Sequence, residues 1–457
     1  MKKEYDIIYL TNTPSFYKIN LCNEIAESAS VLLVFYGYGS EAVNKMLKSE
    51  DSYKFDYVFL FEGDASKRNR LKVFGRLCRL MSHIRCKKIL YSGWLAPEYN
   101  LLSFFTPKKK NCLICESSVL ESDFSGGKGW LKKQIIGRMA VALPSGELQK
   151  MIFEEIGYTG KIVMTGGVGI FNKIEKSELQ GEDRKNKKYL YVGRLIPCKN
   201  LNFLIDEFNK NGRWLTIVGK GELEQQLKAK AKENIHFVGF VENEKLSTVY
   251  QDHDVFILPS RSEVWGLVVE EAIYWGLPVV VSDRVGAYRD MVEKPKTGLV
   301  FELDNQDSFN NALKEIENNY SFYKKNADRF DFDKRDECQV NAYLKLIFFQ
   351  AEDGIRDGKK KKANALGCNR TKRRESRRSE KNERIYRGEK VSKGRIVLRT
   401  KRAVIRPGDI VYVGKKKYIV ASSKNLGKQL KLADGSLLTT SKVTKIIHCG
   451  GWKTVTL

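Results

Sequence analysis

The chain has 457 residues and 42% of them are hydrophobic, which is enough to fill the cores of two or three domains and excludes general disorder. Its net charge of +26 is uneven: residues 350–457 carry 30 Lys and Arg against 9 Asp and Glu, which leaves 51 against 46 in residues 1–349. The first 349 residues therefore have no strong general attraction for polyanions. The nine cysteines lack disulfide-like spacing and no apolar run is long enough to span a bilayer, so we expect a cytoplasmic protein.

Short apolar runs alternate with helix-period stretches in residues 1–175, a pattern typical of a parallel sheet covered by helices. The predicted strands are Ile7–Leu10, Val31–Tyr36, Tyr57–Phe61, Lys88–Tyr91, Cys112–Cys115 and Ala140–Leu143. This segment is predicted to be a Rossmann-like domain.

The first domain also contains a basic amphipathic stretch. Residues 67–88 carry nine Lys and Arg, with Leu71, Phe74, Leu77, Cys78, Met81 and Ile84 on one helical face. A second cluster, Phe104 to Lys110, combines aromatic residues with Lys108–Lys110. Both favour peripheral contact with the anionic inner face of a membrane. An ordinary core-facing helix with a solvated basic face explains the stretch equally well.

A second alternating series occupies residues 186–325, after a polar stretch from Glu175 to Lys188. Its predicted strands are Tyr189–Val192, Trp214–Val218, Ile235–Val238, Val255–Leu258 and Pro278–Val281. The fold class is therefore α/β, with two doubly wound Rossmann-like domains whose ligand cleft lies at the carboxyl ends of the strands. A closing helix at about 336–349 is expected to pack back on the first domain.

Two turns in the second domain could hold a diphosphate. Gly193 allows a sharp turn at a strand end, after which Arg194 and Lys199 can converge, and Gly219 ends the next strand. Two fixed cations suit a diphosphate leaving group, because negative charge builds up on it as the glycosidic bond breaks. Such turns are common, so simple surface exposure is an alternative explanation for each of them.

The most informative segment is a loop followed by a helix. Glu263, Val264, Trp265, Gly266 and Leu267 follow a buried strand, and a helix is predicted to begin near Gly266. The free backbone N–H groups at its start form an anion site. Glu263 and Glu271 can both face one cleft, where carboxylates accept hydrogen bonds from sugar hydroxyls. Glu270 and Glu271 are about 100° apart around the helix, so only one of them is expected to point inward.

These residues resemble the E-x7-E pattern of the retaining, GT-B-type glycosyltransferases of family 4. The collinear motifs are Gly193-Arg194-Leu195 with Lys199, Gly219-Lys220-Gly221-Glu222, Val238-Gly239-Phe240, Pro259-Ser260, Glu263 with Glu271, Gly276-Leu277-Pro278, Gly286 and Thr297-Gly298-Leu299. The resemblance covers about 110 residues closely, is looser over residues 1–175 and is absent after about 349.

The resemblance implies a glycosyltransferase of cell-envelope polysaccharide synthesis that uses a nucleotide-sugar donor and needs neither a cofactor nor a metal. Arg194 and Lys199 would hold the diphosphate, Glu263 would contact the sugar and Glu271 the ribose. Retention by front-face substitution is likewise implied by the family, as is an acceptor that is a glycan or a polyprenyl-linked saccharide.

The acceptor side is expected at the strand ends of the first domain. Thr13-Pro14-Ser15-Phe16-Tyr17-Lys18 resembles the P-S-x-Y-[KR] opening of bacterial members, which makes Tyr17 and Lys18 candidate acceptor contacts. Stabilising the first loop is the alternative role for both. Glu116, after a predicted strand, is a third candidate. Many relatives carry a histidine after the fourth strand, where this chain has Ser92-Gly93-Trp94.

The last hundred residues differ in character. Residues 350–387 form a basic linker, in which residues 350–357 back-translate to a sequence resembling a common sequencing-library adapter. A chimeric reading frame joined near Phe349 would explain them. Residues 388–457 are predicted to form a small basic β-rich module, faintly resembling the C-terminal region of transposon-encoded HNH-type nucleases. Nucleic-acid binding through this tail is one alternative function, and a nucleotide-sugar epimerase of the same fold is another.

Overall fold

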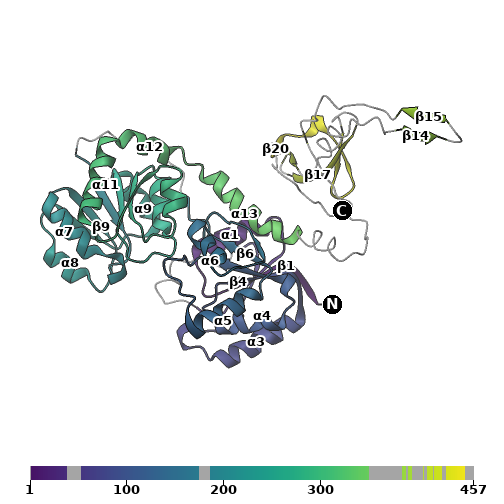
Figure 1. Ribbon diagram of the computed structural model, residues 1–457, viewed down its shortest axis with the longest axis horizontal. Helices are drawn as coiled ribbons and strands as arrows, with labels where there is room; N and C mark the ends of the chain where they lie inside the picture. The colour runs from purple at the N-terminus through teal and green to yellow at the C-terminus, as the bar shows by residue number, and fades with distance from the viewer. Residues whose placement is uncertain are drawn as a thin grey trace. The chain divides into compact units, whose positions relative to one another are not determined.

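The computed structural model describes residues 2–38, 53–173, 186–348, 383–386, 390–393, 405, 409–414, 416–424 and 429–447. They fall into two compact units, Met1–Ile347 and Phe348–Leu457 (Figure 1). The adapter-like segment and most of the basic linker lie outside the described residues, as does most of the polar stretch between the two predicted domains.

The first domain of unit 1 is a seven-stranded parallel sheet in the order β3-β2-β1-β4-β5-β6-β7. The strands are β1 Lys3–Thr11, β2 Val31–Phe35, β3 Asp56–Phe59, β4 Ile84–Ser92, β5 Asn111–Cys115, β6 Val141–Pro144 and β7 Lys161–Ile162. The helices are α1 Phe16–Ala26, α3 Arg70–His83, α4 Pro97–Phe105, α5 Gly126–Gly137 and α6 Glu147–Glu155. Because every strand is parallel, the carboxyl ends of β1, β4 and β5 meet at one edge of the sheet.

The basic amphipathic stretch is partly different from the prediction. Helix α3 ends at His83, and Ile84 already begins β4. The helix buries Val73 and Leu77, whereas Leu71 is 84% exposed. Leu71 lies about 160° around the helix from Val73, so it does not share one face with the buried Leu77, as the prediction had it.

The second domain is a six-stranded parallel sheet in the order β10-β9-β8-β11-β12-β13. The strands are β8 Lys188–Val192, β9 Trp214–Val218, β10 Ile235–Gly239, β11 Val255–Leu258, β12 Val279–Ser282 and β13 Gly298–Phe301. The helices are α7 Leu201–Asn211, α8 Glu224–Lys230, α9 Asn243–Gln251, α10 Leu267–Tyr274, α11 Gln306–Asn318 and α12 Tyr320–Asp328, with a π-helical turn η5 at Tyr288–Glu293.

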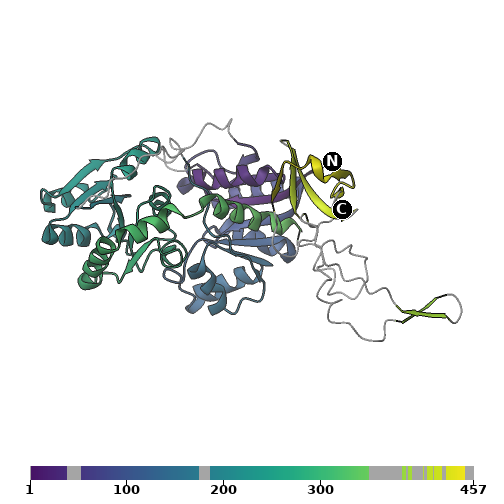
Figure 2. The ribbon, with the colours of Figure 1, turned by 90° about the horizontal axis from the view of Figure 1, so that it is seen from above.

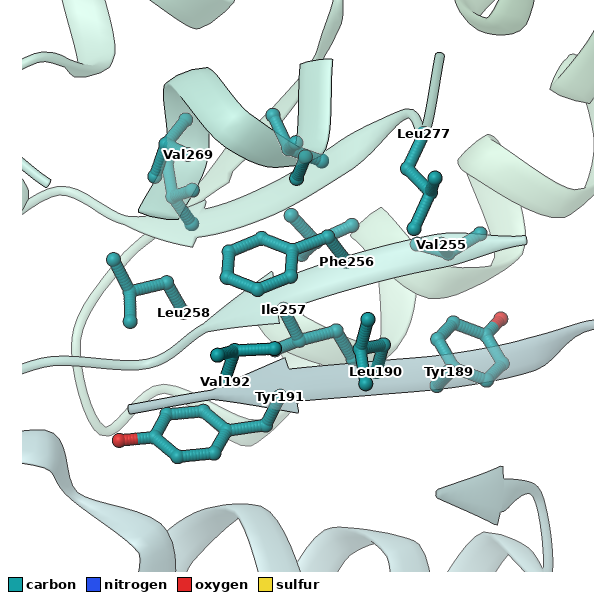
Figure 3. Packing of buried hydrophobic residues seen from close by; sticks show 14 of the residues in the cluster. Tyr189, Leu190, Tyr191, Val192, Val255, Phe256, Ile257, Leu258, Val269 and Leu277 are labelled. Carbon is teal, nitrogen blue, oxygen red and sulfur yellow. The ribbon is translucent and has the colours of Figure 1, made fainter. Parts of the chain in front are cut away.

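The centre of this domain explains the continuous apolar runs of β8 and β11. Both strands are covered on both faces, so every residue from Val255 to Leu258 is buried. Figure 3 shows side chains of the two strands packed in one cluster with Val269 of α10. Burial of the strand β11 on both faces fixes the position of the loop that follows it, and this loop carries Glu263.

A long helix, α13 (Phe332–Phe348), joins the two domains of unit 1. Phe332 packs in the core of the second domain, whereas Tyr343 and Leu346 pack in a cluster of the first domain with Ile19 and Ile25. Figures 1 and 2 both show α13 in green running alongside the first domain. The helix begins at Phe332, ahead of the predicted range, and its second half packs on the first domain.

Unit 2 contains a hairpin of β14 (Glu383–Tyr386) and β15 (Lys390–Lys393) and a five-stranded antiparallel sheet. The strands of this sheet are β16 Ile410–Val413, β17 Lys416–Lys424, β18 Gln429–Leu432, β19 Leu437–Thr439 and β20 Lys445–Ile447. Ile405, Val411, Val420, Leu430 and Leu432 form its small core.

Candidate active site

The ends of β8 and β9 approach each other so closely that side chains are excluded. A Cβ atom on Gly219 would lie 1.9 Å from the carbonyl oxygen of Gly193, and one on Gly221 would lie 2.3 Å from that of Leu195. The N–H of Gly219, whose φ is +138°, donates to the carbonyl of Gly239. Bare backbone therefore forms this part of the sheet edge, so a ligand could approach it closely.

Lys199 and Glu263 are brought together by two different loops. Lys199 ends a 3-10 turn (Pro197–Lys199) after β8, and its ammonium forms an ion pair with the Glu263 carboxylate. Both side chains are largely buried. Arg194 is exposed in the loop between β8 and this turn, and its carbonyl accepts a hydrogen bond from the Tyr191 hydroxyl at 3.0 Å. The contacts thus join Lys199 directly to Glu263 and leave the Arg194 guanidinium at the surface.

The loop that carries Glu263 is held by a neighbouring turn. The N–H of Glu263 donates to the Arg284 carbonyl, and Gly286 donates back to the Glu263 carbonyl at 2.8 Å. Gly266, with φ +104°, ends the loop and caps α10, which begins at Leu267. A residue with a side chain would be strained at this φ. Glycine therefore fixes the position at which the free N–H groups of the helix are presented.

The two adjacent glutamates on α10 have different surroundings, as expected from their angular separation. Glu270 is fully buried, accepts a hydrogen bond from the Trp265 indole at 2.6 Å, and forms an ion pair with Arg335 of α13. Glu271 instead lines a hollow with Phe16, Phe171, Tyr250 and Trp275 among others. Glu271 is therefore the glutamate that is available to a ligand. The N–H of the buried Trp265 ring already donates to Glu270 and is not free to bind a ligand.

Burial raises the pKa of Glu271 to about 7, while a hydrogen bond from Tyr250 opposes this shift and the charge of Glu270 adds to it. The Tyr250 hydroxyl donates to Oε2 of Glu271 at 3.0 Å. Proton loss from Glu271 therefore falls in the neutral pH range.

The three acceptor-side candidates also meet. The Lys18 ammonium lies 3.0 Å from Oε1 of Glu116, and it lies over the Tyr17 ring at 5.6 Å from the centroid. Desolvation lowers the pKa of Lys18, but the charge of Glu116, the nearby Tyr17 and the hydrogen bond to Glu116 together raise it overall. Two fully buried hydroxyls in this part of the domain, Thr11 Oγ1 and Ser118 Oγ, have no hydrogen-bond partner among the described residues.

Sequence reasoning missed four residues around this site: Glu121, Gln149, Tyr250 and Arg335. The pKa of Glu121 in the first domain is raised, first by desolvation and then by the charge of Glu263, so the two carboxyl groups interact across the domains. Gln149 donates to the loop after Glu263. None of the four belongs to a motif of the second domain's site, so only the tertiary structure reveals them.

The two aspartates of Asp331-Phe332-Asp333, a D-x-D spacing that occurs in some metal sites, have structural partners at the start of α13. Asp333 forms an ion pair with Lys173 at 2.7 Å, and Asp336 pairs with the same ammonium at 2.6 Å. No group of three or more potential metal-ligating side chains occurs in the part of the chain that the structure describes.

Comparison with known families gives a match to the part of the chain that contains Lys199, Glu263 and Glu271. Residues 172–334 match the family described as Glycosyl transferases group 1. An uncharacterized glycosyltransferase of Haemophilus influenzae is 30% identical over 194 residues, which are 40% of this chain and 53% of that protein. The chain thus spans about half the length of this curated relative.

Solved structures resemble a larger part of the chain. The apo form of the lipopolysaccharide outer core galactosyltransferase WaaB has a TM-score of 0.57 at 15% identity, over 76% of this chain and 99% of WaaB. HepE from Anabaena, in complex with UDP-glucose, has a TM-score of 0.51 at 14% identity, over 77% of this chain and 99% of HepE. The fold is that of the GT-B glycosyltransferases, and the group 1 segment forms its second domain together with the start of α13.

Proposed function

We propose that the protein is a glycosyltransferase that moves a sugar from a nucleotide-sugar donor to a saccharide acceptor. The observation that carries the proposal is the Lys199–Glu263 ion pair beside the start of α10, within the group 1 segment. A cation, an acidic side chain and a helix start are what a departing diphosphate and a sugar ring require.

The chemistry divides among these residues. The bond between the sugar C1 and the diphosphate oxygen breaks, while a bond forms between C1 and an acceptor hydroxyl oxygen. The Lys199 ammonium has three N–H donors, so it can keep its ion pair with Glu263 and still donate to a phosphate oxygen. Arg194 would add a second cation. The acceptor proton goes to the leaving phosphate, so no separate base is required. Attack on the same face, with retention as in family 4, follows from the family resemblance.

Glu263 would accept hydrogen bonds from hydroxyls of the transferred sugar, and Glu271 from the nucleotide ribose. The backbone of Gly193, Gly219 and the loop Val264–Leu267 would line the donor site. The bare backbone at Gly219 and the exposure of Glu271 to a hollow support this assignment. No metal or cofactor is required by the proposed reaction.

The acceptor is proposed to be a glycan or lipid-linked saccharide of the cell envelope. The similarity in fold to WaaB, a lipopolysaccharide outer core galactosyltransferase, supports this class. Tyr17, Lys18 and Glu116 offer aromatic, cationic and anionic groups at the strand ends of the first domain, which suit a polyhydroxylated ligand.

A donor panel tests the proposal. The full chain is incubated with UDP-glucose, UDP-galactose, UDP-N-acetylglucosamine and GDP-mannose, each with and without extracted cell-envelope glycolipid. We expect release of one nucleoside diphosphate, greatly accelerated by the glycolipid. Conversion of the donor to another nucleotide sugar without acceptor would indicate an epimerase instead, and failure to bind any donor would refute the proposal.

Donor affinity should depend on pH through Glu271. The carboxylate accepts hydrogen bonds from ribose hydroxyls and the protonated acid accepts them less well, so affinity is expected to rise with pH and level off above about 7. Below this value it should fall by up to about tenfold per pH unit. Calorimetric titration with the nucleotide sugar between pH 5.5 and 8.5 measures it, since the diphosphate diester has no ionisation in this range. The Glu271→Gln variant should bind more weakly and without this pH step; an unchanged step would assign it to another group.

Membrane attachment is a further part of the proposal. Leu71, Phe105 and Trp130 are 84%, 72% and 62% exposed, on α3, α4 and α5 respectively. These helices lie together on the first domain (Figure 1), with Phe74 of α3 near Phe105 and Arg138 at the end of α5 over Phe104. Lys72, Lys108, Lys109, Lys128 and Lys133 around them are exposed as well. Exposed apolar side chains and exposed lysines on the same or adjacent elements favour an anionic lipid surface. Every helix in the described ranges is too short or too polar to cross a bilayer.

Replacing Lys108 and Lys109 by alanine should release the protein from vesicles of anionic phospholipid, since each basic residue near the surface contributes about 1 kcal/mol. Lys110 is left in place because its ammonium donates to the Cys86 carbonyl at 2.7 Å. Co-sedimentation at low and high salt measures the effect. The control, Lys314→Ala with Lys325→Ala, removes the same charge from exposed helix positions of the second domain. Equal sedimentation of both variants would contradict docking through this surface.

A further inference from the structure

The first domain contacts the loop that carries Glu263. Helix α6 of the first domain begins at Glu147, and the preceding residue, Gly146, has no room for a side chain. A Cβ there would lie 2.3 Å from Oδ2 of Asp290 and 2.7 Å from Cζ3 of Trp265. A Cβ on Gly286, on the other side of the loop, would lie 1.8 Å from the Val264 carbonyl oxygen. Close packing by Gly146 against the Trp265 ring and by Gly286 against the Val264 backbone leaves the loop little freedom to move.

Gln149, in the first turn of α6, bridges the loop and its supporting turn. The side chain is fully buried, and its Nε2 donates to the Val264 carbonyl at 3.2 Å and to the Gly286 carbonyl at 3.4 Å. The Gly286 N–H in turn donates to the Glu263 carbonyl. Because carbonyl groups only accept, the amide nitrogen must be the atom that faces them. One side chain of the first domain thus touches both segments that define where Glu263 lies.

Charged groups at the start of α6 add to the contact between the first domain and the η5 turn of the second domain. Oδ2 of Asp290 accepts from the N–H of Glu147 at 2.8 Å, at the positive end of α6. The Lys294 ammonium binds both Glu147 at 2.6 Å and Asp290 at 2.8 Å. These contacts hold the two domains together, and among them it is the Gln149 amide that reaches the Val264 carbonyl, next to Glu263.

We propose that Gln149 is a positioning residue for the transfer reaction: it fixes the Glu263 loop from the opposite domain, so that the carboxylate and Lys199 meet the donor sugar correctly. The inference rests on the proposed function. Gln149 would touch neither donor nor acceptor. It acts through the Val264 carbonyl, and an error of about 1 Å in such a loop can lower turnover by roughly 100-fold.

The test compares Gln149→Met with the wild-type full chain, using UDP-glucose and GDP-mannose as donors and UDP and GDP as ligands. Methionine has nearly the same length but no N–H donor, so the loop loses its two hydrogen bonds without losing volume. We expect kcat to fall at least about tenfold, with the dissociation constant for the nucleoside diphosphate changed less than about twofold, because Lys199 and Glu271 remain. Gln149→Glu, which keeps the length and an acceptor but lacks the amide donors, should show the same loss and recover partly at low pH, where the acid can donate.

Lys150→Met is the matched control, since Lys150 lies next in α6 and pairs with Glu154 on the surface at 2.7 Å. It should keep wild-type kcat. Thermal melting of all variants checks folding, and if Gln149→Met does not fold, Gln149→Glu supplies the kinetic answer. A wild-type kcat in the Gln149 variants, or a loss that matches Lys150→Met, would overturn the inference. A wild-type protein inactive with every donor would instead refute the proposed function.

Discussion

Replacing Lys199 by methionine should lower sugar transfer by roughly 10²–10³-fold at saturating donor. The ammonium lies where the diphosphate would depart, so its attraction grows as negative charge develops on the leaving group. It also neutralises Glu263, its ion-pair partner, and without it that largely buried carboxylate would repel the phosphates. We therefore expect both a lower kcat and weaker donor binding, measured by steady-state kinetics.

Lys228→Met controls for the loss of one positive charge in the same domain. Lys228 lies on α8 and pairs with Glu224 at 2.7 Å on the surface. The Lys228→Met variant should therefore keep the transfer activity of the wild type. The double variant Lys199→Met with Glu263→Gln should lose less than the product of the two single losses, because the residues act as a pair. Full activity in Lys199→Met would remove the main support for the proposed chemistry.

Replacing Arg335 by methionine should lower the free energy of unfolding by about 3–5 kcal/mol. Arg335 of α13 pairs with the fully buried Glu270 of α10, and its removal leaves that carboxylate buried without a cation. Desolvation already raises the pKa of Glu270 while Arg335 opposes the rise. In the variant, Glu270 would therefore take up a proton more readily on folding. The stability deficit relative to wild type should consequently shrink as the pH is lowered from 7 towards 5.

Chemical denaturation at several pH values measures this deficit. The matched control is Arg213→Met, because Arg213 pairs with Glu317 at 2.7 Å but both side chains are partly solvated. That variant should lose only about 1 kcal/mol. If the two variants were equally stable, the buried pair would contribute no more than a surface one.

The fold and the centre of the site follow largely from local sequence. Continuous apolar runs such as Val255–Leu258 predict strands buried on both faces, and Gly193 and Gly219 mark turns at strand ends where backbone segments meet. The angular separation of Glu270 and Glu271 predicts that only one of them points into the cleft; Glu271 lines a hollow, whereas Glu270 is fully buried. These features depend on contacts between residues close in the chain.

Long-range partners could not be predicted in this way. Gln149 and Val264 are 115 positions apart in the sequence. Several strands and helices, from β12 to α12, separate Glu270 from Arg335 along the chain. No local spacing or periodicity therefore relates the members of either pair. Leu71 was misplaced for a related reason: an apolar residue in a helix-period stretch does not reveal whether a neighbouring element covers it. Its exposure depends on where α4 packs against α3.

Helix α13 has a consequence for exchanging donor domains between related enzymes. Its first turn packs Phe332 beside Phe171 and Tyr274, while Tyr343 and Leu346 complete a cluster of the first domain. If the exchanged segment ended before Phe332, the incoming second domain would lose its own aromatic residue at this position of its core. If it ended after Phe348, foreign side chains would replace Tyr343 and Leu346 in the cluster of the first domain. Hybrid proteins should therefore be joined within the helix, between Asp336 and Tyr343, so that each half keeps its native neighbours.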